Sequence, residues 1–136
     1  TAIPLNRRIS LTLTGSYTYQ KAIDVTSKED KNYKDQIPYT PVHSGNASLS
    51  VETPWVNLAY TATGVSERYY LPQNIRENRI DGYVEHALTA SRTFSLGSCK
   101  LRLQAELINL TDEQYDIIKY YPMPGRSFRL TGSIKF

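Results

Sequence analysis

The feature that most constrains the fold is a strict alternation of apolar and polar side chains over the ten residues Ser127–Phe136. The even positions carry Phe, Leu, Gly, Ile and Phe, whereas the odd positions carry Ser, Arg, Thr, Ser and Lys. Because successive side chains of a strand point to opposite faces, this pattern predicts a strand with one apolar and one polar face. Ten residues is also a suitable length for a tilted strand to cross a lipid bilayer.

Five earlier segments show the same period of two, and we therefore predict an all-β, antiparallel up-and-down meander of about six long strands. In the clearest of them, Ile9, Leu11 and Leu13 alternate with Ser and Thr. In the least regular one, His86 falls on an otherwise apolar face, where we expect a bulge or a shifted register. Residues 1–8 leave little room for two further strands. The approximate bounds of the five segments are 8–21, 39–52, 55–64, 81–94 and 100–110.

The connections between these segments alternate in length. Short turns lie near residues 53–54 and 95–98, and long polar stretches cover about 24–36, 65–79 and 111–122. Short turns on one side of a sheet and long loops on the other are typical of outer-membrane barrels.

The aromatic residues sort to the two ends of the predicted strands. Trp55, Phe94 and Phe136 fall at the end with the short turns. Two aromatic bands that flank an aliphatic middle are typical of a membrane barrel, whose amphipathic rings lie at the level of the lipid headgroups. The tyrosines at or beyond the other end are Tyr17, Tyr19, Tyr39, Tyr69, Tyr70, Tyr83, Tyr115, Tyr120 and Tyr121.

Composition excludes several other classes of protein. A mean hydropathy of −0.46 leaves no apolar run long enough for a transmembrane helix. The charges are scattered and sum to +3, which gives no support to a nucleic-acid partner. Cys99 is the single cysteine, and His43 and His86 lie in separate segments without metal-ligand spacing. We therefore expect no metal site, no cofactor and no enzymatic activity.

The last third of the chain resembles the C-terminus of TonB-dependent outer-membrane receptors. Those barrels carry an N-L-x-D-x-x-Y segment, then P-G-R, then a strand that ends on an aromatic residue. The resemblance implies that residues 1–136 are the C-terminal segment of a 22-stranded transmembrane β-barrel, with the plug and most of the barrel supplied by other parts of the receptor. The matching residues are Asn109, Leu110, Asp112 and Tyr115, then Pro124, Gly125 and Arg126, and finally Phe136.

This resemblance also implies a function and a set of partners. The family imports scarce nutrients of the iron–siderophore, haem or cobalamin type across the outer membrane of Gram-negative bacteria, driven by the TonB energy-coupling complex through the plug. The expected partners are outer-membrane lipid, the rest of the receptor, the TonB complex, the barrel-assembly machinery and a small nutrient ligand. Because Thr1–Leu5 reads like the interior of a longer sequence, we expect a fragment of a receptor. Phe136 resembles the terminal aromatic that serves as the barrel-assembly signal.

The long loops supply the candidate ligand-binding residues, since aromatic and Arg side chains are common binding anchors. In the last loop, we expect Gly125 to allow a tight approach into the final strand and Arg126 to anchor the loop. An alternative interpretation is a small self-contained β-barrel or β-sheet that acts as a binding or structural module of the cell envelope. A complete small barrel needs at least about eight strands, more than the six predicted. The candidate ligand-binding residues are Tyr33, Arg68, Tyr69, Tyr70, Tyr120 and Tyr121.

Overall fold

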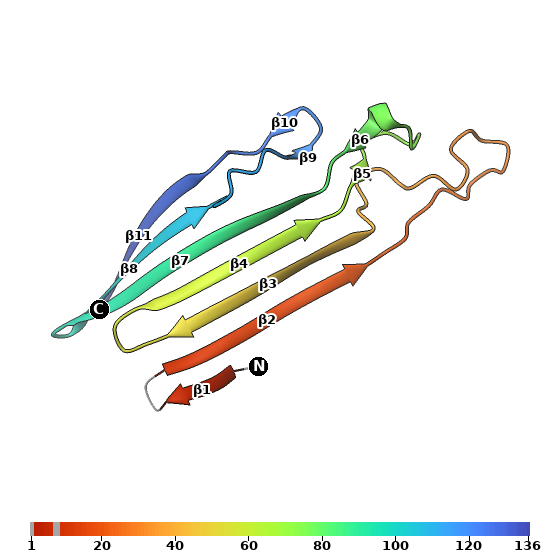
Figure 1. The fold of residues 1–136 in the computed structure, drawn as a ribbon. Coiled ribbons are helices and arrows are strands. Elements are labelled where there is room, and N and C mark those ends of the chain that lie inside the picture. Colours follow the sequence, from red (N-terminus) through yellow and green to blue (C-terminus); the bar gives the residue numbers. More distant parts are fainter. Residues whose placement is uncertain (1, 7–8) are drawn as a thin grey trace.

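The protein forms a seven-stranded antiparallel sheet in which every strand pairs with its neighbours along the meander (Figure 1). The structure is a computed structural model and describes residues 2–6 and 9–136. The order β1-β2-β3-β4-β7-β8-β11 confirms the all-β, antiparallel up-and-down arrangement. The strands are β1 (Ala2–Asn6), β2 (Ile9–Tyr19), β3 (His43–Glu52), β4 (Asn57–Val65), β7 (Tyr83–Leu96), β8 (Cys99–Ile108) and β11 (Ser127–Lys135).

The six long strands agree with the six predicted segments to within four residues at either end. The predicted count of about six strands is one short, because β1 pairs with the first part of β2, with Ala2 opposite Thr12. The long connections are also more ordered than a polar composition suggests. They contain the short strands β5 (Arg68–Tyr69), β6 (Arg79–Ile80), β9 (Asp116–Ile118) and β10 (Tyr121–Pro122), and the 3-10 helix η1 (Arg76–Asn78).

Long and short connections lie at opposite ends of the sheet (Figure 1). In the β3–β4 turn, the Thr53 hydroxyl accepts hydrogen bonds from the backbone N–H groups of Trp55 and Val56. In the β7–β8 turn, Leu96 pairs with Cys99, and Gly97 has a φ of +62°, a conformation that costs glycine little. The predicted alternation of connection lengths is therefore present in the fold.

The register places the apolar residues of all six long strands on one face. Leu13 of β2 lies opposite Leu49 of β3, and the same row continues across the sheet to Phe128 of β11. His86 occupies the apolar face in a regular register opposite Ala62, so the expected bulge or register shift was wrong. The complete row is Leu13, Leu49, Tyr60, Leu88, Leu107 and Phe128.

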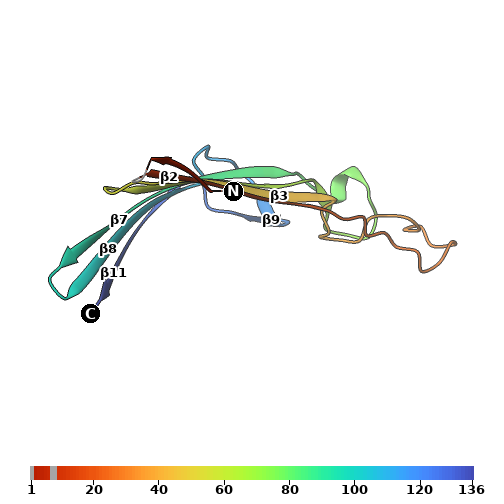
Figure 2. The same ribbon diagram turned by 90° about the horizontal axis from the view of Figure 1, so that it is seen from below.

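Over residues 2–6 and 9–136 the sheet is a single layer, and Figure 2 shows no second layer on either side of it. Its apolar face is therefore open, with 57% of Leu13 and 69% of Phe128 exposed. Monomeric soluble proteins rarely leave so large an apolar surface uncovered. Among the described residues, no helix has the length and hydropathy needed to span a membrane.

Candidate functional site

Buried side chains gather at the end of the sheet where the three long connections meet. Ile80 and Tyr115 are the buried apolar residues among those described, and Arg68, Asn78 and Asn109 are buried polar residues of the same region. Since loops on a rigid scaffold carry most binding functions, this cluster is the candidate site.

Arg68 holds two of the long connections together. It is 4% exposed, and its Nη2 donates to the carbonyl oxygens of Asp116 (2.7 Å) and Ile117 (3.0 Å) in the last connection. Its guanidinium lies 5.9 Å from the ring centroid of Tyr83. The structure thus places Arg68 inside the loop cluster, where it packs the scaffold rather than facing solvent.

Tyr115 fastens the last connection to the polar face of β7. Its ring stacks on Tyr83 and its hydroxyl donates a hydrogen bond to the carboxylate of Glu85. Burial raises the pKa of Tyr115 well above the ordinary value, and the adjacent Glu85 carboxylate raises it further. Tyr115 therefore stays protonated and serves as a donor. The prediction that Tyr83 and Tyr115 belong to an aromatic girdle was wrong, because both rings lie on the polar side of the sheet with Glu85.

The middle connection, residues 66–82, is tied to both of its neighbours. On one side, the Tyr39 N–H donates to the Tyr69 carbonyl (2.7 Å) and the Asn74 N–H donates to the Asp35 carboxylate (3.2 Å). On the other side, Lys119 Nζ donates to the Arg79 carbonyl (3.0 Å). The three long connections therefore form one continuous rim.

A cluster of tyrosines forms part of the surface of this rim, and each long connection contributes one of them. The Tyr70 and Tyr120 rings meet edge to face with centroids 6.0 Å apart. A hydrogen bond with Tyr120 raises the pKa of Tyr70, and burial and the proximity of Tyr39 raise it further. Tyr120 is 72% exposed, so much of its ring is free to contact a ligand.

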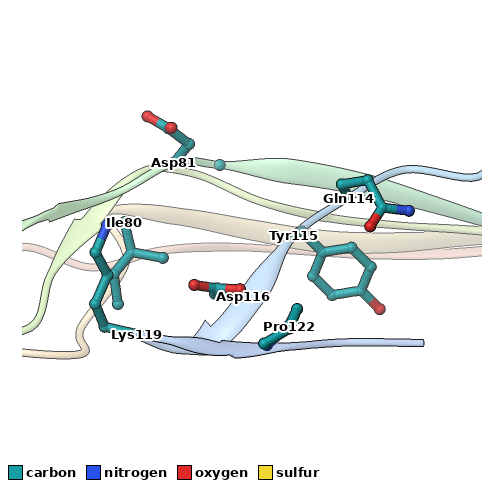
Figure 3. A pocket seen from close by; sticks show the side chains of 8 residues that line it. Ile80, Asp81, Gln114, Tyr115, Asp116, Lys119 and Pro122 are labelled. Atoms are coloured by element: carbon teal, nitrogen blue, oxygen red, sulfur yellow. The ribbon is translucent and has the colours of Figure 1, made fainter. Parts of the chain in front are cut away.

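A pocket of about 220 Å³ lies between the middle and last connections (Figure 3). Asp116 lines it, but its carboxylate already accepts a hydrogen bond from the Tyr120 N–H. The Asp81 side chain points away from the other labelled side chains in Figure 3 and forms an ion pair with Arg79. No group of three His, Cys, Asp or Glu side chains able to hold a metal ion occurs in the part of the chain that the structure describes.

Asn109 closes the base of the last connection. It is fully buried and has a φ of +53°, a conformation that Asn tolerates better than most residues. Its Nδ2 donates to the carbonyls of Glu113 (2.8 Å) and Pro124 (3.2 Å), and its Oδ1 accepts from the Glu113 N–H (2.8 Å). The Asn of the N-L-x-D-x-x-Y segment therefore joins the two ends of one loop.

Gly125 and Asp112 complete this closure. The Asp112 Oδ1 accepts a hydrogen bond from the Arg126 N–H at 2.7 Å, and a Cβ added to Gly125 would lie 2.6 Å from the same oxygen. The tight approach predicted for Gly125 is present. The backbone N–H of Arg126 takes part in this closure, and an anchoring role of its side chain stays a prediction.

The other predicted ligand-binding residues are distributed over the rim. Tyr69 and Tyr70 belong to the middle connection and are half-buried, whereas Tyr120 and Tyr121 are exposed on the last connection. Tyr33 lies on the first long connection beside Lys34, whose ammonium is 5.5 Å from its ring centroid. The structure brings Tyr70 and Tyr120 together. Phe136, the predicted assembly signal, is 93% exposed at the short-turn end.

Sequence reasoning missed the partners of the two histidines. The Tyr17 hydroxyl lies 2.7 Å from His43 Nδ1, and the Tyr60 hydroxyl lies 2.6 Å from His86 Nδ1. Both pairs are on the apolar face, where each ring also stacks on its partner. The sequence contains a signal for these pairs, because the alternation of faces along each strand places all four residues on the apolar face.

Comparison with known proteins identifies the sheet. A family model described as TonB dependent receptor-like, beta-barrel matches residues 4–110. The match ends before Pro124, so it is independent of the P-G-R segment on which part of the resemblance rested. A comparison with curated proteins finds no match to the chain.

Proposed function

Since the chain belongs to the family of TonB-dependent receptor-like β-barrels, we propose that residues 1–136 are the C-terminal wall segment of a 22-stranded receptor barrel. The family is one of outer-membrane receptors and transporters of Gram-negative bacteria and not a family of enzymes. The proposed receptor imports a scarce nutrient of the iron–siderophore, haem or cobalamin type, with energy from the TonB complex.

The observation that carries this proposal is the two-sided sheet. One face presents a continuous row of apolar and aromatic side chains from Leu13 to Phe128, and the other presents mainly hydroxyl, amide and charged side chains. A barrel wall between lipid and a polar interior needs this division, because lipid accepts no unpaired polar groups.

The edges of the sheet support a larger closed structure. Among the described strands, β1 and β11 each have one hydrogen-bonded neighbour. An open edge cannot face hydrocarbon, so the proposed barrel closes through further strands that pair with both edges. In this arrangement the polar face surrounds the plug, and the terminal strand with Phe136 is the segment read by the barrel-assembly machinery.

The tyrosines on the surface of the rim are the proposed contact surface for the nutrient. Tyr70 and Tyr120 form its centre, and Tyr33, Tyr69 and Tyr121 extend it. Tyrosine rings offer a large apolar area with a polar tip and lose little conformational entropy on binding. Arg68 acts here by holding the middle and last connections in place, through its bonds to Asp116 and Ile117.

The test uses the full-length receptor in its own outer membrane. We expect the receptor to fractionate with the outer membrane. We also expect its deletion to abolish uptake of one ligand among a ferric siderophore, haem and cobalamin, each supplied radiolabelled at nanomolar concentration. Binding should survive collapse of the proton gradient whereas uptake should stop, because only translocation needs energy. Fractionation elsewhere, or uptake that continues without the gradient, would refute the proposal.

A further inference from the structure

Three cations on the polar face have no acidic partner among the described residues. Lys100 and Arg102 of β8 and Lys135 of β11 lie near the short-turn end of the sheet. The ion pairs between the described residues involve only Arg79 and Arg129 as cations. Arg102 has only neutral acceptors, Ser91 Oγ at 3.4 Å and Gln104 Oε1 at 3.3 Å.

The carboxylates of the same face are already engaged. Glu106 forms an ion pair with Arg129 at 2.5 Å, Glu85 accepts from the Tyr115 hydroxyl, and Glu52 accepts from Ser10 Oγ at 3.3 Å. Among the described strands, no acidic residue forms an ion pair with these three cations.

The register concentrates these charges. Lys100 lies directly opposite Lys135 across the β8–β11 pair, and Arg102 lies opposite Ser133, one row further into the sheet. Since residues two apart on a strand share a face and lie about 7 Å apart, the three cations form one compact group. Like charges directly opposite each other in a sheet are destabilising, so this arrangement favours a partner that supplies negative charge.

We propose that Lys100, Arg102 and Lys135 bind an acidic segment of the polypeptide that fills the barrel interior. This inference rests on the proposed function, because it takes the polar face as the inner wall. The residue types fit such a partner, since ammonium and guanidinium groups form strong charge-assisted hydrogen bonds with carboxylates. Lipid phosphate is a poorer candidate because the three cations lie on the face opposite the apolar surface.

Zero-length cross-linking tests the contact directly. A water-soluble carbodiimide joins an amine to a carboxylate only when the two touch, and it would be applied to the full receptor in outer-membrane vesicles. We expect proteolysis and mass spectrometry to find Lys100 or Lys135 joined through an amide to an Asp or Glu of the interior segment. Links only to residues outside the interior, or no link at either lysine, would overturn the inference.

A charge-removing variant provides the second measurement. We expect K100Q/R102Q/K135Q to lower the urea concentration at which protease reaches the interior segment, and high salt to abolish the difference from wild type. The matched control is Arg92→Gln, at the same end of the sheet but on the apolar face opposite Leu103. Equal urea midpoints for the triple variant and wild type would count against the inference.

The outcomes also separate this inference from the proposed function. A receptor that fails to reach the outer membrane, or imports nothing, disproves the function itself. A receptor that imports its ligand but shows no amide link and no salt-dependent urea shift disproves only the acidic contact. If the triple variant instead loses binding to vesicles of anionic phospholipid, the cations bind lipid and the inference is wrong.

Discussion

The rings of Tyr83 and Tyr115 stack with their centroids 3.9 Å apart and their planes inclined by 16°. Tyr83 opens β7 and Tyr115 belongs to the last long connection, so the stack fastens this loop to the polar face of the sheet. The Tyr115 hydroxyl reaches Glu85 on the same face. The position of the last loop is therefore set by contacts with the sheet as well as by its own backbone.

The hydroxyl of Tyr115 makes the last loop sensitive to alkaline pH. Burial and Glu85 raise its pKa, so the stabilisation is complete below the pKa of an unfolded tyrosine, about 10, and is lost as pH rises through the higher folded value. We expect Tyr115→Phe to cost about 1–2 kcal/mol at neutral pH and to remove this contribution to the alkaline loosening. The rate at which a protease cleaves residues 112–122, followed from about pH 8 to about pH 11, measures this alkaline loosening. The exposed Tyr121→Phe is the control, and an unchanged pH slope in Tyr115→Phe would contradict the assignment.

Asn109 stabilises the last loop through both its side chain and its backbone. Asn109→Gly keeps the positive φ but removes three hydrogen bonds, and we expect it to lower the free energy of loop unfolding by about 2–3 kcal/mol. Asn109→Ala should cost about 1 kcal/mol more, because alanine disfavours this backbone conformation. Hydrogen exchange of residues 110–126 gives both values. Asn46→Ala, on the exposed polar face, should leave the exchange unchanged.

Gly125 is required by the position of the Asp112 carboxylate. Gly125→Ala should displace this carboxylate and break its hydrogen bond to the Arg126 N–H, at a cost of about 1–3 kcal/mol. Gly132→Ala is the matched control, because its Cβ would meet Leu103 Cδ2 at an ordinary 3.6 Å. In an Asp112→Gly background the effect of Gly125→Ala should nearly vanish, and a full additive loss measured by urea unfolding would disagree with this mechanism.

Tyr60 and His86 satisfy each other's hydrogen-bonding groups on the apolar face. We expect Tyr60→Phe to lower the unfolding free energy of the receptor by about 1–2 kcal/mol, because it leaves a polar nitrogen of His86 unpaired beside lipid. Tyr60→Phe/His86→Leu should recover most of this loss. Gel mobility after stepwise heating reports the change in thermal stability. Tyr17→Phe, whose partner His43 is exposed, should have a smaller effect because water can replace the hydroxyl.

Tyr70 and Tyr120 should contribute jointly to ligand affinity. We expect each change to alanine to weaken binding about tenfold, equivalent to about 1.4 kcal/mol. The double variant should lose less than the sum, because the two rings contact each other. Titration of the radiolabelled nutrient on whole cells measures these affinities. Tyr19→Ala, on the apolar face, is the control, and unchanged affinity in both single variants would exclude this part of the rim from binding.

Much of the sheet could be predicted from the sequence because the face of each side chain depends only on its position within its own strand. A period of two fixes which side chains share a face, and the face that holds Leu13 was correctly assigned in all six long strands. The alternation also predicts that His86 lies on the apolar face, and this is correct. The bulge that we expected at His86 is absent from the regular pairing of β4 with β7. The strand β1 escaped prediction because five residues containing Pro4 show too short a pattern.

The contacts of the rim could not be predicted, because they join residues far apart in the chain. Arg68 meets Asp116 across a separation of 48 residues, and no local pattern distinguishes it from an exposed loop arginine. Tyr83 and Tyr115 were grouped with the girdle tyrosines by their position near strand ends. The face of Tyr83 follows from its parity with Glu85, but its partner follows only from the three-dimensional path of the last loop.

Asn109 joins the two ends of the last connection by bonding both Glu113 and Pro124. The ten residues between these partners, 114–123, are thereby closed off at the end of the β8–β11 hairpin. We therefore expect changes within residues 114–123 to leave the pairing of β8 with β11 intact. A substitution inside the loop is thereby kept from the hairpin and passes instead to the neighbouring connection, through Arg68 and Lys119.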